Sequence, residues 1–227
     1  MTNTIPENLK ARMKESYDAI AEEYNTKFTT ATDHIRLEYL SRLFAQLQST
    51  GNDTATVLEL GCGAGVPATR FLLQSEKPLI HVTGNDLSTS QLDLARTNLA
   101  PYAERLTLVE GDMNSLSFPD NSFDAVTGFY SIIHLPREEQ TQLVKKIAQW
   151  LKPGGHLLAN FGAEENQTIE NEKWLGHDKG WMFWSGWGEE KSVKMVEEAG
   201  FKVMERELRQ AVGDAEFVWI LARKYAV

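Results

Sequence analysis

Three closely spaced glycines form the part of this sequence whose residue types and spacing could bind a reactive ligand. Gly61, Gly63 and Gly65 directly follow the apolar run VLEL and precede a helical pattern that opens near Pro67. Glycine lets the chain turn sharply and lets a ligand touch the backbone where a Cβ would obstruct it. The segment therefore predicts a loop for a nucleotide-like ligand, although such a pattern alone can also be a tight turn.

Two aspartates follow the next two apolar runs. Asp86 stands just past LIHVTG, and Asp112 follows LTLV within VEGDMNSLSF. A carboxylate at the first of these positions can accept hydrogen bonds from both hydroxyls of a ribose. Taken singly, each aspartate is also compatible with an ordinary turn residue or a helix cap. In series with the glycines, the two aspartates support each other as ligand-binding residues.

The spacing of the glycines separates two classes of adenosine ligand. Dinucleotide-binding loops have the pattern G-x-G-x-x-G, in which the third glycine permits close helix packing beside a pyrophosphate. Here the glycines are spaced G-x-G-x-G, and position 66 is Val. Val66 therefore argues against a nicotinamide cofactor.

The elements that must position these residues alternate between apolar runs and helical patterns, which is typical of βα units around a parallel sheet. Helices are predicted to open at Ser88, with Gln91 completing a capping box, and at Pro136. The apolar runs 201–208 and 216–225 are joined by a short polar connection, so they should pair antiparallel. Five buried strands are predicted at 56–60, 79–84, 106–109, 124–130 and 156–161.

Composition and charge narrow the function classes. The 227 residues carry a formal net charge of -9, which disfavours a nucleic-acid or anionic membrane partner. No apolar stretch approaches the roughly 20 residues of a membrane span, and the start MTNTIPENLKARMK lacks the apolar core of a signal peptide. The single cysteine, Cys62, agrees with a reducing compartment. We therefore expect a cytoplasmic protein of one domain, as a monomer or homodimer.

Taken in order, these motifs resemble the class I S-adenosylmethionine-dependent methyltransferases over roughly residues 13 to 162. The glycine loop is similar to the family's first motif, FPDNSFDAVTGFYSIIHLP to its fourth-strand region, and WLKPGGHLLANF to the turn into its fifth strand. The segment SYDAIAEEYNTKF resembles the opening helix of the ubiquinone-biosynthesis-like branch. The resemblance implies an α/β, Rossmann-like fold with a seven-stranded, mostly parallel sheet, an antiparallel last strand, helices on both faces and a helical N-terminal lid.

The resemblance also suggests how a single methyltransferase domain, 1–227, is divided. Residues 1–50 would form the N-terminal helical lid and residues 51–162 the cofactor-binding core. Residues 163–190 would be an aromatic insertion on the substrate side, and residues 191–227 the last helix and the antiparallel strand pair.

A set of ligands for S-adenosylmethionine is implied by the same resemblance. Asp86 would bind the ribose, Asp112 the adenine amino group, and Met113 would pack on the adenine ring. Glu59 would help hold the methionine portion, directly or through water, or else cap nearby amides as a strand-end carboxylate. The whole implied set is Tyr24, Glu59, Gly61, Gly63, Asp86, Leu87, Gln91, Asp112, Met113 and Phe129.

Methyl transfer is an in-line displacement, so the enzyme must hold an acceptor atom roughly 3 to 3.5 Å from the methyl carbon. A general base is needed only when the nucleophile arrives protonated. His134 is the candidate base, because it follows a strand whose carboxyl end faces the ligand crevice. The alternative is a histidine that hydrogen-bonds locally or lines the pocket. No residue spacing resembles a metal centre, so no metal is expected.

Aromatic residues are dense after the fifth strand, on a segment that otherwise looks irregular. Trp181, Trp184 and Trp187 could wall a pocket for a planar, hydrophobic or cationic acceptor, with Tyr17 contributing from the N-terminal helix. The alternative for these tryptophans is a small core between the segment and the N-terminal helices. Tyr17 and Tyr24 could likewise be lid residues or simply pack their helix on the sheet edge.

The function that these observations favour is transfer of a methyl group to a small-molecule acceptor at oxygen, nitrogen, sulfur or carbon. A non-catalytic regulatory protein that binds S-adenosylmethionine is the alternative from another class. A protein methyltransferase and an NAD-dependent oxidoreductase are further alternatives, and Val66 argues against the last.

Overall fold

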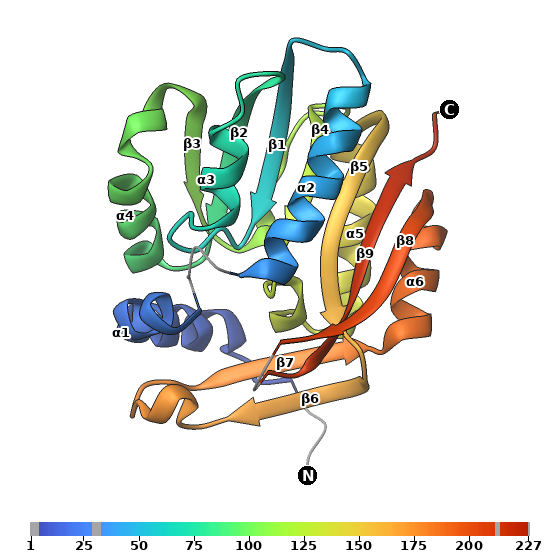
Figure 1. Cartoon of the computed structure of the whole chain (residues 1–227). Helices are drawn as coiled ribbons and strands as arrows, with labels where there is room; N and C mark the ends of the chain where they lie inside the picture. Colours follow the sequence, from blue (N-terminus) through green and yellow to red (C-terminus); the bar gives the residue numbers. More distant parts are fainter. Residues whose placement is uncertain (1–4, 29–32, 212–213, 227) are drawn as a thin grey trace.

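A seven-stranded sheet forms the centre of the computed structural model, which describes residues 5–28, 33–211 and 214–226. Its strands lie in the order β3-β2-β1-β4-β5-β9-β8 (Figure 1). The pairs from β3 through β5 are parallel, whereas β9 runs antiparallel to both β5 and β8. The sheet with an antiparallel last strand that the resemblance implied is thereby confirmed. The strands are β1(Thr54–Leu60), β2(Leu79–Asp86), β3(Leu106–Glu110), β4(Phe123–Gly128), β5(Leu151–Gly162), β8(Phe201–Gln210) and β9(Glu216–Lys224).

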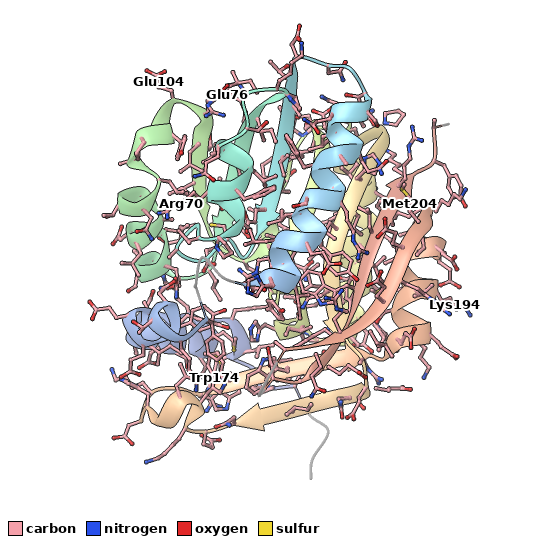
Figure 2. All side chains as sticks on the ribbon, in the orientation of Figure 1. Arg70, Glu76, Glu104, Trp174, Lys194 and Met204 are labelled. Atoms are coloured by element: carbon pink, nitrogen blue, oxygen red, sulfur yellow. The ribbon has the colours of Figure 1, made fainter. Side chains whose placement is uncertain are left out.

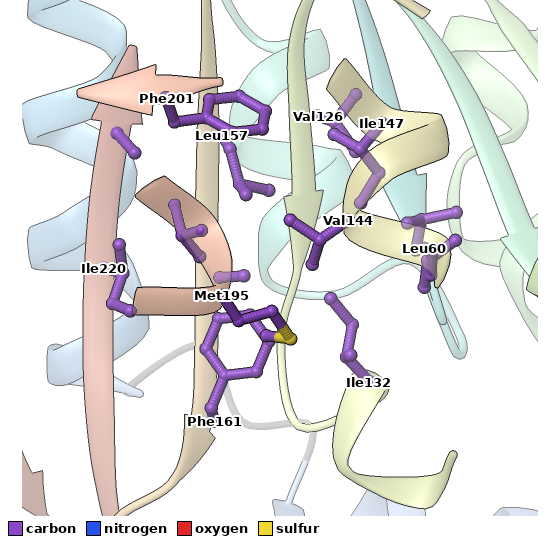
Figure 3. Packing of buried hydrophobic residues seen from close by; sticks show 14 of the residues in the cluster. Leu60, Val126, Ile132, Val144, Ile147, Leu157, Phe161, Met195, Phe201 and Ile220 are labelled. Atoms are coloured by element: carbon purple, nitrogen blue, oxygen red, sulfur yellow. The ribbon is translucent and has the colours of Figure 1, made fainter. Parts of the chain in front are cut away.

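Helices cover both faces of this sheet. Alternate strand residues point to opposite faces, so β1 sends Val57 toward one layer of helices and Leu58 toward the other. The Val57 side packs against α2(His34–Ser49), α3(Ala68–Leu73) and α4(Thr89–Asn98). The Leu58 side, shown in Figure 3 below, packs against α5(Arg137–Trp150) and α6(Glu189–Glu198). The site is thus built on a sheet that is buried on both faces.

The outer surface of the helices and the edge strand carries both charged and apolar side chains. Figure 2 shows Lys194 on α6 pointing away from the sheet, with Met204 on the edge strand β8. Inside, Leu60, Val126 and Ile147 meet in the apolar layer drawn in Figure 3, and all three are fully buried. Since Leu60 ends β1 and Val126 lies in β4, this packing fixes the loops that follow both strands.

A helix and a hairpin cross the carboxyl ends of the parallel strands. The helix is α1(Leu9–Phe28), and the hairpin consists of β6(Glu165–Asn171) and β7(Met182–Trp187), which form a separate antiparallel sheet (Figure 1). Leu9, Met13 and Ile20 of α1 are buried against the segment 181–183. The interpretation of 171–190 as irregular was therefore wrong where β7 lies. The aromatic residues of this segment suit a strand, but its four glycines obscured that pattern.

Short turns complete the chain between these elements. They are the 3-10 helices η1(Ala100–Arg105), η2(Met113–Ser115), η3(Ile132–His134) and η4(Trp174–Gly176). The predicted antiparallel pairing of the last two strands is confirmed, and part of their connection, Val212 and Gly213, lies outside the described residues. Within the described ranges, we find no helix that is long and apolar enough to cross a membrane.

Candidate functional site

A cavity that is partly open to solvent, with about 680 Å³ of empty space including that opening, lies between α1 and the carboxyl ends of the parallel strands. Every predicted cofactor ligand except Glu59 lines it, and so do Tyr17 and His134. The sequence prediction missed Lys10, Met13, Gly111, Tyr130, Ser131 and Leu135. Lys10 and Met13 on α1 could have been predicted, because they recur with Tyr17 and Tyr24 at the spacing of one helix face.

The glycine loop is shaped by packing as well as by the cavity. Gly61, Gly63 and Gly65 have φ of +70°, +53° and +75°, the left-handed region that side chains disfavour. A Cβ on Gly61 would lie 2.3 Å from Cβ of Ser131, and one on Gly65 would lie 2.4 Å from Cδ1 of Leu99. At Gly63 the nearest atom would be 3.7 Å away. Gly65 therefore serves helix packing, while Gly61 and Gly63 line the cavity.

Asp86 ties this loop to the start of α4. Its Oδ2 accepts a hydrogen bond from the Gly63 N–H at 2.8 Å, and its Oδ1 accepts one from the Ser88 N–H at 2.9 Å. Burial raises the pKa of Asp86, and the backbone donors oppose that shift. The two oxygens of a carboxylate offer about four acceptor positions, so positions remain for the hydroxyls of a ligand.

The predicted capping box forms only in part. Ser88 caps α4 by accepting a hydrogen bond from the Gln91 N–H at 3.1 Å. The Ser88 N–H is donated to Asp86, so the Gln91 side chain does not reach back to it. Gln91 instead lines the cavity, where its Oε1 accepts a hydrogen bond from Asn25. Its Nε2 is buried and has no hydrogen-bond partner among the described residues. A buried unpaired donor indicates a missing acceptor, either water or ligand.

The part of the cavity after β3 is closed by contacts from α1 and α5. Asp112 accepts a hydrogen bond from the Asn114 N–H at 3.0 Å and so caps η2. Nζ of Lys10 lies 3.4 Å from Asp112 and 2.6 Å from Glu139. Lys10 therefore links α1 to the loop after β3 and to α5 at this end of the cavity.

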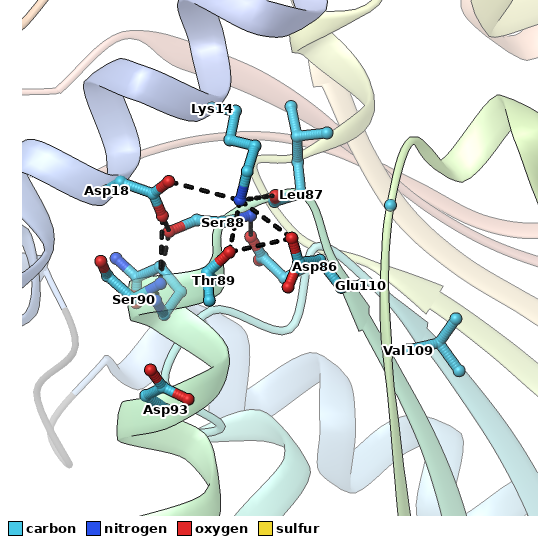
Figure 4. A network of polar contacts seen from close by, with 12 residues as sticks. Lys14, Asp18, Asp86, Leu87, Ser88, Thr89, Ser90, Asp93, Val109 and Glu110 are labelled. Atoms are coloured by element: carbon cyan, nitrogen blue, oxygen red, sulfur yellow. Dashed lines mark hydrogen bonds and ion pairs between the residues drawn. The ribbon is translucent and has the colours of Figure 1, made fainter.

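A further polar network joins α1 to α4 beside Asp86, as Figure 4 shows. Nζ of Lys14 donates to Thr89, to the Leu87 carbonyl and to Glu110. One carboxylate oxygen of Asp18 accepts hydrogen bonds from the Ser88 hydroxyl at 2.6 Å and from the Ser90 N–H at 3.0 Å. These contacts hold α1 over the loop that carries Asp86 and Leu87.

His134 and Tyr17 form a hydrogen-bonded pair in the cavity wall. Nδ1 of His134 lies 2.7 Å from the carbonyl oxygen of Phe183, which can only accept, so Nδ1 carries the proton. Nε2 of the neutral ring then accepts the hydrogen bond from the Tyr17 hydroxyl at 2.8 Å. Burial lowers the pKa of His134 to about 4 and raises that of Tyr17 well above its usual value. Both side chains are neutral near pH 7.

Glu59 lies behind the glycine loop. It is 2% exposed and accepts a hydrogen bond from the Thr69 hydroxyl at 2.6 Å. Burial raises the pKa of Glu59 to about 7, and the charge of Arg36 opposes this shift. Because Glu59 is not among the lining residues, its predicted role toward the methionine portion stays a prediction.

The three predicted tryptophans lie outside the lining of the cavity. Trp181 packs under the Arg12 guanidinium at 3.8 Å, and Trp187 donates its indole N–H to the Arg137 carbonyl at 3.0 Å. The ring of Trp184 lies 6.0 Å from that of His134, between centroids. None of the three is a lining residue, so their predicted contact with an acceptor stays a prediction.

The glycine loop also contains Cys62, which is buried and whose thiol pKa is raised by burial. In the part of the chain that the structure describes, no cluster of three His, Cys, Asp or Glu side chains could hold a metal ion. Polar side chains that line the cavity include Asp86, Asp112, Gln91 and the Tyr17–His134 pair.

Residues 57–155, from β1 into β5, match the family described as methyltransferase domain. The chain is 29% identical over 168 residues to a sterol 24-C-methyltransferase of Yarrowia lipolytica, covering 72% of this chain and 43% of that protein. It is 30% identical over 158 residues to a 27-O-demethylrifamycin SV methyltransferase of Amycolatopsis mediterranei, covering 68% and 52%. The chain thus spans about half the length of these curated relatives.

One solved structure resembles the chain over nearly its whole length. It is the Burkholderia thailandensis 1,6-didemethyltoxoflavin-N1-methyltransferase with bound 1,6-didemethyltoxoflavin and S-adenosylhomocysteine. The TM-score is 0.73 at 17% identity, covering 98% of this chain and 91% of that one. At this identity the likeness concerns the fold.

Substitution of Gly61 tests the packing of the loop. Gly61→Ala should lower the free energy of unfolding by about 3 kcal/mol, because left-handed strain and a clash with Ser131 add up. Gly51→Ala is the matched control: its φ is +73° with no atom within 4 Å of a Cβ, so it should cost only about 1 kcal/mol. Urea denaturation measures both. Equal losses would contradict the proposed contact with Ser131.

The tautomer and titration of His134 form a second prediction. Ring ¹⁵N spectra should show a protonated Nδ1 and a bare Nε2 down to a pH near 4, with His134→Gln identifying the signals. Folding lowers the pKa of His134 from 6.5 to about 4, so the unfolded chain binds this proton more readily than the folded chain. The neutral ring therefore contributes its full stability to the fold above pH 6.5. That contribution should be lost as the pH falls from 6.5 through 4. A ring that gains its second proton near pH 6.5 would contradict the assignment.

Proposed function

We propose that the chain, which belongs to the class I S-adenosylmethionine-dependent methyltransferases, transfers a methyl group to a small-molecule acceptor. The observation that carries the proposal is the convergence of two groups in one cavity. Asp86, Gln91 and Asp112 suit an adenosine, and the Tyr17–His134 pair suits an acceptor that must lose a proton.

The residues of the cavity fit S-adenosylmethionine. Gln91 presents a buried donor that has no partner in the part of the chain that the structure describes, Asp86 has acceptor positions beyond its two backbone donors, and Gly63 has no side chain between its backbone and the cavity. In this proposal Asp86 holds the ribose hydroxyls, Asp112 accepts from the adenine amino group and Met113 packs on the ring. Leu87, Phe129 and Tyr24 supply further contacts. When bound, S-adenosylmethionine supplies an electrophilic methyl group on its sulfonium.

The Tyr17–His134 pair would take the proton of the acceptor. Tyr17 donates its own proton to Nε2 of His134, so its oxygen can accept a hydrogen bond from an acceptor O–H or N–H. As the acceptor attacks, its proton passes to the Tyr17 oxygen while the Tyr17 proton passes to His134. The imidazolium that results is held by its Nδ1–H bond to the Phe183 carbonyl. For an O–H acceptor the low pKa of His134 is no obstacle, because an oxygen that gains a methyl group becomes strongly acidic.

The acceptor in this proposal is small and mostly apolar. Met13 and Leu135 line the cavity beside the rings of Tyr17 and Tyr24, and these side chains suit a flat or hydrophobic molecule. Trp184 would support that wall through its contact with His134. Trp181 and Trp187 would support it from positions further from the acceptor. A formal net charge of -9 argues against nucleic acid as substrate. In this proposal the protein is cytoplasmic.

Titration of the product tests the role of Asp86. S-adenosylhomocysteine should bind the purified chain, and Asp86→Ala should weaken binding by about 2 kcal/mol, roughly 30-fold, through lost hydrogen bonds to a charged group. Asp93→Ala on the exposed side of α4 is the matched control and should change nothing. An Asp86→Ala variant that folds and keeps full affinity would refute the assignment.

Turnover tests catalysis itself. We expect release of S-adenosylhomocysteine with at least one member of a panel of phenols, heteroaromatic N–H compounds and amines. With that acceptor, Tyr17→Phe should lower kcat about 100-fold or more, the usual range for lost acid–base help. Its affinity for S-adenosylhomocysteine should stay within twofold. No turnover with any acceptor, despite tight cofactor binding, would favour a regulatory protein that binds S-adenosylmethionine.

A further inference from the structure

The β6–β7 hairpin supplies one of the two partners of His134. Nδ1 of His134 donates to the Phe183 carbonyl in β7, and this bond leaves Nε2 as the atom that meets Tyr17. The position of the ring therefore depends on where β7 lies relative to η3. Whatever holds these two segments together also sets the proton relay, a step that rests on the proposed function.

Two residues further along β7, Ser185 contacts the residues that follow His134. Its hydroxyl donates to the Leu135 carbonyl at 2.7 Å. Its carbonyl and hydroxyl oxygens lie 3.0 Å and 3.1 Å from Nε2 of Gln140, in the first turn of α5. Three alternate residues of β7 thus bond to the short segment 134–140, namely Phe183, Ser185 and Trp187.

Gln140 is the central member of this network. Its side chain is fully buried, and Nε2 donates to the Leu135 carbonyl at 2.9 Å and to the Ser185 carbonyl at 3.0 Å. An amide with two carbonyl oxygens beside one of its atoms must place its nitrogen there, because a carbonyl oxygen only accepts. Since Oε1 has no partner among the described residues, the bonds that this amide makes are those of its nitrogen. One amide group thereby links the loop after η3 to β7.

The network lies beside an apolar layer. Ile132, Leu135 and Leu143 belong to the buried cluster on this face of the sheet. Apolar contacts are non-directional, so they set the position of one element against another only loosely. Buried amides and carbonyls set it closely, because a shift would leave each of them without a partner. Gln140 and Ser185 therefore fix a position that apolar packing alone leaves open.

We propose that Gln140 and Ser185 are positioning residues for methyl transfer. They hold β7 against the start of α5, so that the Phe183 carbonyl meets Nδ1 of His134 and Nε2 meets the Tyr17 hydroxyl. Neither Gln140 nor Ser185 lines the cavity, so both act through the histidine. The hairpin thereby takes part in the proton relay as well as in the wall around the acceptor.

Gln140→Met tests the inference, because methionine has a similar length but no N–H donor. With an acceptor that the wild-type chain methylates, kcat should fall about 10-fold to 100-fold, the effect of a small misplacement of a reacting group. The KM of the acceptor and the Kd of S-adenosylhomocysteine should stay within twofold, since the lining is unchanged. Loss of a purely structural residue would lower the free energy of unfolding without this split.

The ring ¹⁵N signals of His134 test the same inference without turnover. In the wild-type chain near pH 7, Nδ1 should carry the proton and Nε2 should be bare. In Gln140→Met a second form, protonated at Nε2, should appear beside the first, because the Phe183 carbonyl is no longer held against the ring.

Ser185→Ala removes one bond of the network, so it should cause both changes to a smaller extent, and it decides if Gln140→Met does not fold. Ser192→Ala in α6 is the matched control, because this buried hydroxyl has no partner among the described residues. It should change neither kcat nor the tautomer. A folded Gln140→Met chain that keeps the wild-type kcat or the single tautomer, or that loses cofactor affinity as much as kcat, would overturn the inference. A wild-type chain without turnover on any acceptor would instead overturn the proposed function.

Discussion

The hydrogen bonds that Asp86 accepts from the backbone of Gly63 and Ser88 fix the two loops between which any ligand of this cavity must lie. They exist because parallel strands end at one edge of the sheet, where the loop after β1 and the end of β2 are neighbours. The apolar layers on both faces hold the strands in register, as the burial of Leu60 and Val57 shows. The same carboxylate that shapes the loops has about four acceptor positions, of which these two backbone donors use two.

α1 completes the site from two sides. On one side, Lys14 and Asp18 bind the segment around Ser88 through hydrogen bonds, and Lys14 also forms an ion pair with Glu110 at the end of β3. On the other side, Leu9, Met13 and Ile20 pack against the hairpin strand β7. Tyr17 lies between these contacts and meets His134, whose other nitrogen bonds the backbone of β7. The proposed proton relay is therefore assembled from α1, η3 and β7, and it depends on α1 being docked.

Much of the site could be predicted because its residues follow strands at short, regular spacing. Asp86, Asp112 and the glycines each stand directly after an apolar run, so their common edge follows from the parallel sheet alone. Other features depend on contacts between distant segments, which spacing does not reveal. Spacing did not reveal the β6–β7 hairpin or the burial of Glu59 away from the cavity. It also did not reveal that His134 bonds the Phe183 carbonyl.

Amide hydrogen exchange with and without S-adenosylhomocysteine tests most directly that the ligand lies between the strand ends and α1. Binding should slow exchange at the amides of Gly61, Gly63 and Leu87 and along 9–28, because these segments either face the ligand or close over it. Exchange in the outer strand β8 should stay the same. Protection confined to other segments, or no protection at saturating ligand, would contradict the account.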